Sequence, residues 1–311
     1  MRSTMNTLVR GLAASFLMLI LAAGATAQQT SSTFAKLQGF PSAEAAADAL
    51  ATAVRNNDDK AVAAMLGPWW RDFVPTGDNQ AIRDRATFLA AWAENHKVTT
   101  TSDKAVVEVG KTGWTLPVPI VKDGAEWRFD VGAGVQEMVD REIGRNEFGA
   151  IQTLMAIVDA ERDYADMDPM KAGAPAYARR LLSSPGRRDG LYWPTKPGEP
   201  LSPLGAQVAN SQSDGRAPGG HYGYNFRLLY AQGAAAPGGA RDYIVNGRMI
   251  GGFAAVAWPV AYGMTGIMTF IVGPDGIVYQ QDLGAETAER AGLLASFNPD
   301  KGWEKADMTP P

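Results

Sequence analysis

The sequence predicts an α+β protein made of two units, each with helices and an antiparallel sheet. Between residues 42 and 93, apolar side chains recur at helical spacing, and from residue 105 the period changes to two, as in strands. After residue 222, short apolar runs that are partly β-branched and bounded by glycine and proline indicate buried strands. The chain has 311 residues, which is enough for two domains of ordinary size.

The first 27 residues have the features of a cleavable secretory signal. Arg2 and Arg10 provide the basic start, residues 12–23 are largely apolar, and Ala25-Thr26-Ala27 matches a cleavage site. The apolar run is shorter than the roughly 20 residues that span a bilayer, which favours cleavage over a membrane anchor. We therefore expect a periplasmic or secreted protein with no membrane span after cleavage.

The composition argues against several classes of function. The formal charge of −4 becomes −6 when Arg2 and Arg10 leave with the signal, so the basic footprint of a nucleic-acid binder is missing. The sequence contains no cysteine, which excludes disulfides, thiolate metal sites and thiol nucleophiles. We expect apolar cores alone to stabilise such an exported protein.

We expect five segments along the chain. They are a signal peptide at 1–27, a flexible leader at 28–41, an N-terminal α+β domain at 42–134, a connecting helical segment at 135–165, and a C-terminal antiparallel α+β domain at 166–311 that begins with a proline-rich loop at 166–221. A loop of this length inside a domain is usually functional or mobile.

The N-terminal domain is predicted to place helices before a curved antiparallel sheet. Ser42 is expected to cap the first helix and Asp58 to start the second. Strands are predicted at 105–109, 115–121 and 126–131, and the prolines at 117 and 119 favour an edge position for the middle one. This order resembles the nuclear-transport-factor-2-like fold over roughly residues 42–132.

The C-terminal domain is predicted to pack a long helix on an antiparallel sheet. The helix is expected to break near Gly144 or Gly149, because glycine disfavours helix interiors. The other predicted elements are a short helix at 176–184, strands at 222–232, 242–245, 253–258 and 267–272, a hairpin turn at 273–276 and a last helix at 287–297. The arrangement resembles the globular part of a type IV pilin, without the hydrophobic N-terminal spine that lets pilins polymerise.

The C-terminal half contains glycine and aromatic motifs in a characteristic order. They are Gly223-Tyr224-Asn225-Phe226-Arg227, Ala231-Gln232-Gly233, Pro237-Gly238-Gly239-Ala240, Met249-Ile250-Gly251-Gly252-Phe253, Trp258-Pro259, Tyr262-Gly263, Met268-Thr269-Phe270-Ile271-Val272 and Tyr279-Gln280-Gln281-Asp282-Leu283-Gly284. In these motifs the chain resembles the exported bacterial family labelled domain of unknown function 2950. The resemblance implies export from a bacterium and brings no established activity, cofactor or catalytic residue.

Signals for known catalytic chemistry are missing from the sequence. It contains no phosphate-binding loop, no nucleophile elbow and no paired-histidine zinc helix. His96 and His221 are its two histidines. We expect His96 to cap a helix end and His221 to lie in a loop, so we predict no catalytic residue, no metal site and no cofactor.

Two groups of aromatic residues are the candidate ligand-binding residues. They are Trp69, Trp70 and Phe73 in the first domain, and Trp258 and Tyr262 in the second. Aromatic side chains beside rigid turns can line an apolar pocket or a partner-binding patch. Packing within the core is the simpler interpretation of both groups.

These observations favour a non-catalytic binding or interaction protein of the bacterial envelope. The expected partner is another envelope protein or a small apolar ligand. One alternative is an enzyme in which Asp72 or Asp84 acts as a general acid or base inside an apolar pocket. A second alternative is a pilin-like structural subunit.

Overall fold

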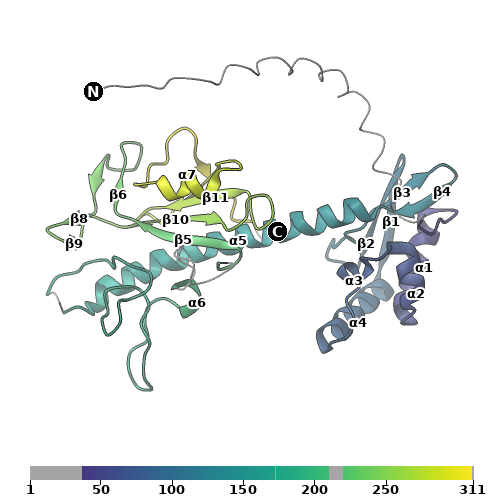
Figure 1. The fold of residues 1–311 in the computed structure, drawn as a ribbon, viewed down its shortest axis with the longest axis horizontal. Helices are drawn as coiled ribbons and strands as arrows, with labels where there is room; N and C mark the ends of the chain where they lie inside the picture. Colours follow the sequence, from purple (N-terminus) through teal and green to yellow (C-terminus); the bar gives the residue numbers. More distant parts are fainter. Residues whose placement is uncertain (1–36, 172, 210–219, 310–311) are drawn as a thin grey trace, which may run out of the picture. The chain divides into compact units, whose positions relative to one another are not determined.

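The structure is a computed structural model that describes residues 37–171, 173–209 and 220–309. The predicted signal peptide and the first nine residues of the predicted leader lie outside the described residues. The chain divides into two compact units, one up to Ala133 and one from Gly134 onward (Figure 1). Each unit has its own apolar core, with Phe253 and Phe270 in one and Trp127 packed against the other. The protein is a mixed helix and sheet protein, and it has two separate hydrophobic cores.

Four helices open the first unit. They are α1 (Ala43–Arg55), α2 (Asp59–Leu66), α3 (Trp70–Phe73) and α4 (Asn79–Glu94). The Ser42 hydroxyl accepts a hydrogen bond of 3.1 Å from the Ala45 N–H, and the Asp58 carboxylate accepts one of 3.0 Å from the Ala61 N–H. Both side chains satisfy backbone donors that have no partner inside the helix, which is why the helices begin at these residues.

The sheet of the first unit is an antiparallel meander. Its strands β1 (His96–Thr101), β2 (Lys104–Val109), β3 (Ile120–Asp123) and β4 (Glu126–Phe129) pair in chain order. The prediction of an edge strand at 115–121 was wrong, because β3 begins at Ile120 and lies between β2 and β4. Pro117 and Pro119 precede β3, so their missing N–H groups remove no hydrogen bond from its ladder.

The end of the predicted leader is part of the first unit. Phe40 is buried, and it exchanges two backbone hydrogen bonds with Trp127, of 2.9 and 2.8 Å. The Gln38 N–H also donates to the Ala64 carbonyl at 3.0 Å. The expectation of a flexible leader is therefore wrong for residues 37–41, because an apolar side chain and a backbone bridge attach them to the core.

The second unit is organised around α5 (Val131–Met167), which is continuous where the sequence predicts a break. A Cβ at position 149 would lie 2.6 Å from the Tyr222 Cγ, so Gly149 is the residue that lets this ring approach the helix. The buried stripe of α5 includes Ile151, Leu154 and Ile157. Burial of each such side chain contributes about 1.5–3 kcal/mol, which outweighs the cost of about 1 kcal/mol for a helical glycine.

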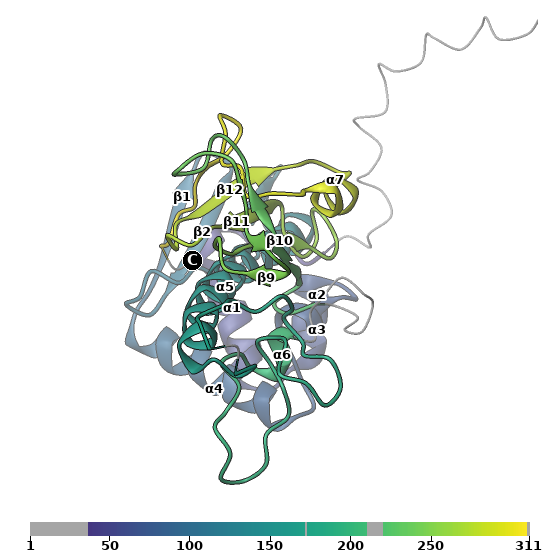
Figure 2. The ribbon, with the colours of Figure 1, turned by 90° about the vertical axis from the view of Figure 1, so that its left-hand side faces the viewer.

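An antiparallel sheet lies against α5. Its strands run in the order β13 (Glu304–Lys305), β12 (Val278–Asp282), β11 (Met268–Val272), β10 (Ala254–Pro259) and β5 (Tyr224–Leu229). Helix α5 runs along one face of the sheet, and α7 (Thr287–Leu293) lies on the other (Figures 1 and 2). Helix α7 ends four residues before the predicted boundary, because Leu294 has an extended ψ of 109°.

Two short ribbons and a long loop complete the second unit. The ribbons pair β6 (Ala231–Gln232) with β7 (Arg241–Asp242), and β8 (Ile244–Val245) with β9 (Arg248–Met249). The predicted helix at 176–184 does not form, since Tyr177 and Leu182 make bridges with Met249 and Tyr192 instead. After α5, the described part of the loop has one short helix, α6 (Ala206–Ala209).

The proline-rich loop packs on the second unit's core. Leu181, Leu191, Trp193 and Leu204 are all buried in the cluster that also contains the sheet residues. Backbone hydrogen bonds fix the loop further, such as the 2.9 Å bond from the Leu191 N–H to the Arg180 carbonyl. Among the described residues, no helix combines the length and apolar character needed to cross a membrane.

Candidate functional site

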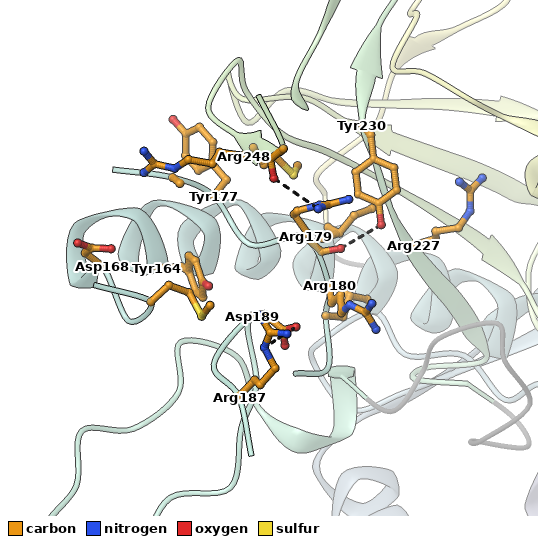
Figure 3. Close-up of a pocket in the computed structure, with 16 residues that line it drawn as sticks. Tyr164, Asp168, Tyr177, Arg179, Arg180, Arg187, Asp189, Arg227, Tyr230 and Arg248 are labelled. Atoms are coloured by element: carbon orange, nitrogen blue, oxygen red, sulfur yellow. Dashed lines mark hydrogen bonds and ion pairs between the residues drawn. The ribbon is translucent and has the colours of Figure 1, made fainter. Parts of the chain in front are cut away.

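A pocket of about 710 Å³ lies in the second unit, where the proline-rich loop meets the sheet. Its walls come from the end of α5, residues 176–181 and 187–189 of the loop, strand β5 and the β8–β9 ribbon (Figure 3). Its volume is in the range of small-molecule sites, which usually span about 300–1,000 Å³.

Arginines dominate the polar lining of this pocket. Five arginines and two aspartates line it: Arg179, Arg180, Arg187, Arg227, Arg248, Asp168 and Asp189. Arg187 lies 3.7 Å from the Asp189 carboxylate. Within the described part of the chain, the other four arginines have no carboxylate within 4.0 Å of their guanidinium nitrogens. The pocket is therefore positively charged, because these four guanidinium groups form no ion pair with the described residues.

Arg227 projects from β5 and is half-buried. Its Nη2 donates to the carbonyls of Leu294 at 2.8 Å, Ala291 at 3.0 Å and Gly292 at 3.4 Å, all at the C-terminal end of α7. Burial lowers the pKa of Arg227, since removal of water disfavours the charged form. The guanidinium is thus fixed in position, and an anion beside it would stabilise its charge.

The other three arginines are held less tightly. The Arg248 Nη2 donates to the Ala174 carbonyl at 2.5 Å, and the Arg179 Nη1 reaches the Gly247 carbonyl at 3.5 Å. The Arg180 guanidinium makes no hydrogen bond with the described residues, while its backbone carbonyl accepts from Leu191. Most of the donors on these three side chains are free for a ligand.

Glu161 supports the loop behind the arginines. Its side chain on α5 is fully buried, and its Oε2 accepts a hydrogen bond of 2.7 Å from the Ala178 N–H, beside Arg179. Its Oε1 has no hydrogen-bond partner. Burial raises the pKa of Glu161 well above its ordinary value, although the Ala178 bond opposes this shift.

Tyr164 lies one turn further along α5 and lines the pocket. Its hydroxyl donates to the Arg188 carbonyl at 2.6 Å. Burial, followed by the nearby Glu161, raises the pKa of Tyr164 to about 12, so the phenol stays neutral. The hydrogen bond anchors the segment that bears Arg187 and Asp189.

Asp189 has a structural role in the same segment. Its carboxylate accepts hydrogen bonds from the Ser184 N–H at 2.7 Å and the Ser184 hydroxyl at 2.9 Å. Burial alone would raise the pKa of Asp189, but the two Ser184 bonds and the Arg187 charge lower it below its ordinary value. Asp189 is therefore ionised, and most of its capacity as an acceptor is used within the protein.

The aromatic residues predicted as ligand contacts lie elsewhere. In the first unit, Trp69 is 61 % exposed, Trp70 is 3 % exposed, and Phe73 is half-buried against the core. In the second unit, Trp258 is buried in the core, and the Tyr262 hydroxyl donates to Asp282 at 3.1 Å. None of the five lines the pocket described above.

The other candidates from the sequence are also placed outside this pocket. Asp72 and Asp84 are both exposed, so neither lies in the closed apolar cavity that the acid–base alternative requires. His96 begins β1 and does not end a helix, and its Nδ1 lies 3.0 Å from the Trp92 carbonyl in the last turn of α4. His221 is half-buried beside Tyr222, and burial lowers its pKa.

Sequence reasoning missed the arginines of the pocket. The available signal was a pair of arginine doublets, at 179–180 and 187–188, inside the proline-rich loop. Arg227 and Arg248 gave no such signal, because only the folding of the loop onto β5 and β9 brings them to the same pocket. In the described ranges, no group of three or more metal-ligating side chains gathers to form a metal site.

A family model described as a protein of unknown function (DUF2950) matches residues 37–306. The chain belongs to this family. The DUF2950 match includes both units and every residue that lines the pocket. No curated protein and no solved structure shows significant similarity to this DUF2950 chain.

Proposed function

We propose that this protein is an exported, non-catalytic binding protein and that its second unit holds a small anionic molecule. The observation that supports this function is the group of four arginines that line one pocket without a carboxylate partner. A site that binds an anion needs such unpaired donors, whereas a structural ion-pair network would use them within the protein. The sequence suggested a small apolar ligand, whereas this proposal assigns an anionic one.

Comparison of anions at equal ionic strength tests this function. Phosphate, sulfate and citrate should each raise the melting temperature of the purified chain above that measured in chloride, both by binding to the native state and by their general exclusion from protein surfaces. The readout is the part of the increase that depends on a pocket arginine. Arg180→Gln removes one pocket charge without loss of a hydrogen bond and should reduce the increase. Arg241→Gln removes an exposed charge outside the pocket and should leave the increase unchanged.

Equal melting temperatures in all four salts would reject the anion site. An equal reduction by Arg180→Gln and Arg241→Gln would also reject it, since the effect would then depend on net charge alone.

We also propose that each unit has the fold that its sequence resembles. Four helices packed with a four-stranded meander support a nuclear-transport-factor-2-like first unit, and a long helix on an antiparallel sheet supports a pilin-like second unit.

A monomer in light scattering at high protein concentration would count against assembly as a pilin-like subunit. Detection of the cleaved chain in a periplasmic or culture fraction would test export.

A further inference from the structure

The arginines of the pocket lie on different sides of it. Arg179 and Arg180 belong to the loop, Arg227 to β5 and Arg248 to β9. In Figure 3, Arg248 lies beside Tyr177 at one side, Arg227 lies at the opposite side, and Arg180 lies below. Their guanidinium groups do not converge on one point. A single phosphate or carboxylate therefore cannot contact all of them.

Each of these separated cations keeps donors for a ligand. A guanidinium group has five N–H donors in a planar fork. Arg227 and Arg248 use Nη2 for backbone carbonyls, which leaves Nη1 and Nε on both side chains. Arg180 keeps all of its side-chain donors. The pocket thus presents at least three separate places where an anionic group can accept charge-assisted hydrogen bonds.

The surface between the cations is apolar and aromatic. Leu228 and Met249 are buried residues that line the pocket, and the Tyr177 and Tyr230 side chains line it as well. The Tyr230 hydroxyl donates to the Arg179 carbonyl at 3.0 Å, which fixes its ring beside the loop. Such surfaces accommodate the ring or short carbon chain of an organic ligand.

The net charge favours phosphate esters over carboxylates. The five arginines exceed the two aspartates of the lining by three charges. Two phosphate esters carry about −3 to −4 near neutral pH, since each contributes about −1.5 to −2. Two carboxylates carry only about −2 and would leave a positive excess.

We propose that the ligand is an organic bisphosphate, with two phosphate groups separated by a ring or short chain. The proposal rests on the anion-binding function given above. Binding of one phosphate near Arg180 and the other near Arg248 would use two of these separated places, and the body between them would contact the tyrosines.

Isothermal titration of the purified chain tests this with three probes. Fructose 1,6-bisphosphate and fructose 6-phosphate share one body and differ in the second phosphate, and adipate is a dicarboxylate of similar length. At about 150 mM salt, we expect the bisphosphate to bind at least about tenfold more tightly than the other two.

Two variants locate the phosphate groups. Arg180→Gln and Arg248→Gln should each weaken bisphosphate binding by about tenfold or more, whereas only one of them should weaken binding of the monophosphate. Arg241→Gln is the matched control and should leave all affinities unchanged. Melting curves without ligand show whether each variant is folded.

The outcomes separate this proposal from the function it rests on. Equal affinity for the bisphosphate and the monophosphate would overturn the two-phosphate ligand and leave an anion site. Tighter binding of adipate would assign a dicarboxylate in place of a bisphosphate. No binding of any probe, together with no stabilisation by phosphate, sulfate or citrate, would overturn both.

Discussion

Glu161 and Ala178 are joined by a hydrogen bond of 2.7 Å, from the backbone N–H of Ala178 to the Oε2 of the buried carboxyl group. This bond connects the core side of α5 to the loop that bears Arg179 and Arg180. The second carboxyl oxygen has no partner, and burial raises the pKa of Glu161 well above its ordinary value of 4.5.

This relationship predicts a pH dependence of stability. Below pH 4.5 the carboxyl group is protonated in both the folded and the unfolded chain. As the pH rises, the unfolded chain loses the proton first, so the free energy of unfolding falls until the folded carboxyl group also ionises. Glu161→Gln cannot ionise and should lose this part of the dependence. Its melting temperature relative to wild type should be higher at about pH 8 than at about pH 5.

Glu142→Gln is the control, because Glu142 is exposed on the same helix. It should keep the wild-type dependence on pH. The same pH dependence in Glu161→Gln and wild type would show that Glu161 does not titrate as its burial requires.

A second prediction concerns two glycines of the second unit. A Cβ at position 266 would lie 2.1 Å from the Tyr224 hydroxyl, which is buried and donates to the Met268 carbonyl at 2.9 Å. Gly266→Ala should therefore destabilise the unit by about 1–3 kcal/mol, since the ring cannot move away easily. In α7, a Cβ at position 292 meets no atom within 4 Å, so Gly292→Ala should be neutral or stabilising by up to about 1 kcal/mol. Urea unfolding measures both, and similar effects would contradict the packing around Tyr224.

Arg227 should matter for stability even without a ligand. Its guanidinium group donates to three carbonyls at the end of α7, and hydrogen bonds from a charged group contribute about 1.5–3 kcal/mol. Arg227→Met should therefore lower the melting temperature of the free chain. Arg180→Gln removes no hydrogen bond and should change stability by less than about 0.5 kcal/mol. A free Arg227→Met chain as stable as wild type would mean that these carbonyl contacts contribute little.

Adjacent tryptophans in the first unit should respond very differently to truncation. Trp70 is 3 % exposed and packs in the core, whereas Trp69 is 61 % exposed. Trp70→Ala should cost about 3–5 kcal/mol, because it removes a large buried side chain and leaves a cavity. Trp69→Ala should cost less than about 1 kcal/mol. Fluorescence-monitored unfolding of the two variants checks this, and equal costs would contradict the placement of Trp70 in the core.

The sequence predicted local features of the fold, such as helix caps and a tight turn. Ser42 and Asp58 cap their helices as expected, because capping depends on residues only three positions away. The predicted hairpin turn at 273–276 forms between β11 and β12, with a positive φ of 76° at Gly276. These features require no knowledge of distant contacts.

Features that depend on distant contacts were missed or wrong. Gly149 suggested a helix break, and only the distant contact with Tyr222 shows why position 149 of α5 needs a glycine. For the aromatic candidates, core packing was the simpler expectation, and it holds for Trp258, whereas Trp69 is exposed. The sequence could not predict that Arg227 and Arg248 line the same pocket. The pocket forms where an irregular loop packs on the strands, and irregular loops give no periodic signal that predicts their contacts.

The anchoring of the proline-rich loop has a consequence for binding kinetics. Because Leu181, Leu191 and Trp193 secure the loop to the core, the walls that bear Arg179 and Arg180 are in place before a ligand arrives. Little backbone conformational entropy is then lost on association, and the remaining cost comes from ordering the arginine side chains. The pocket should behave as a preorganised receptor, in which differences of affinity between ligands arise mainly from their rates of departure.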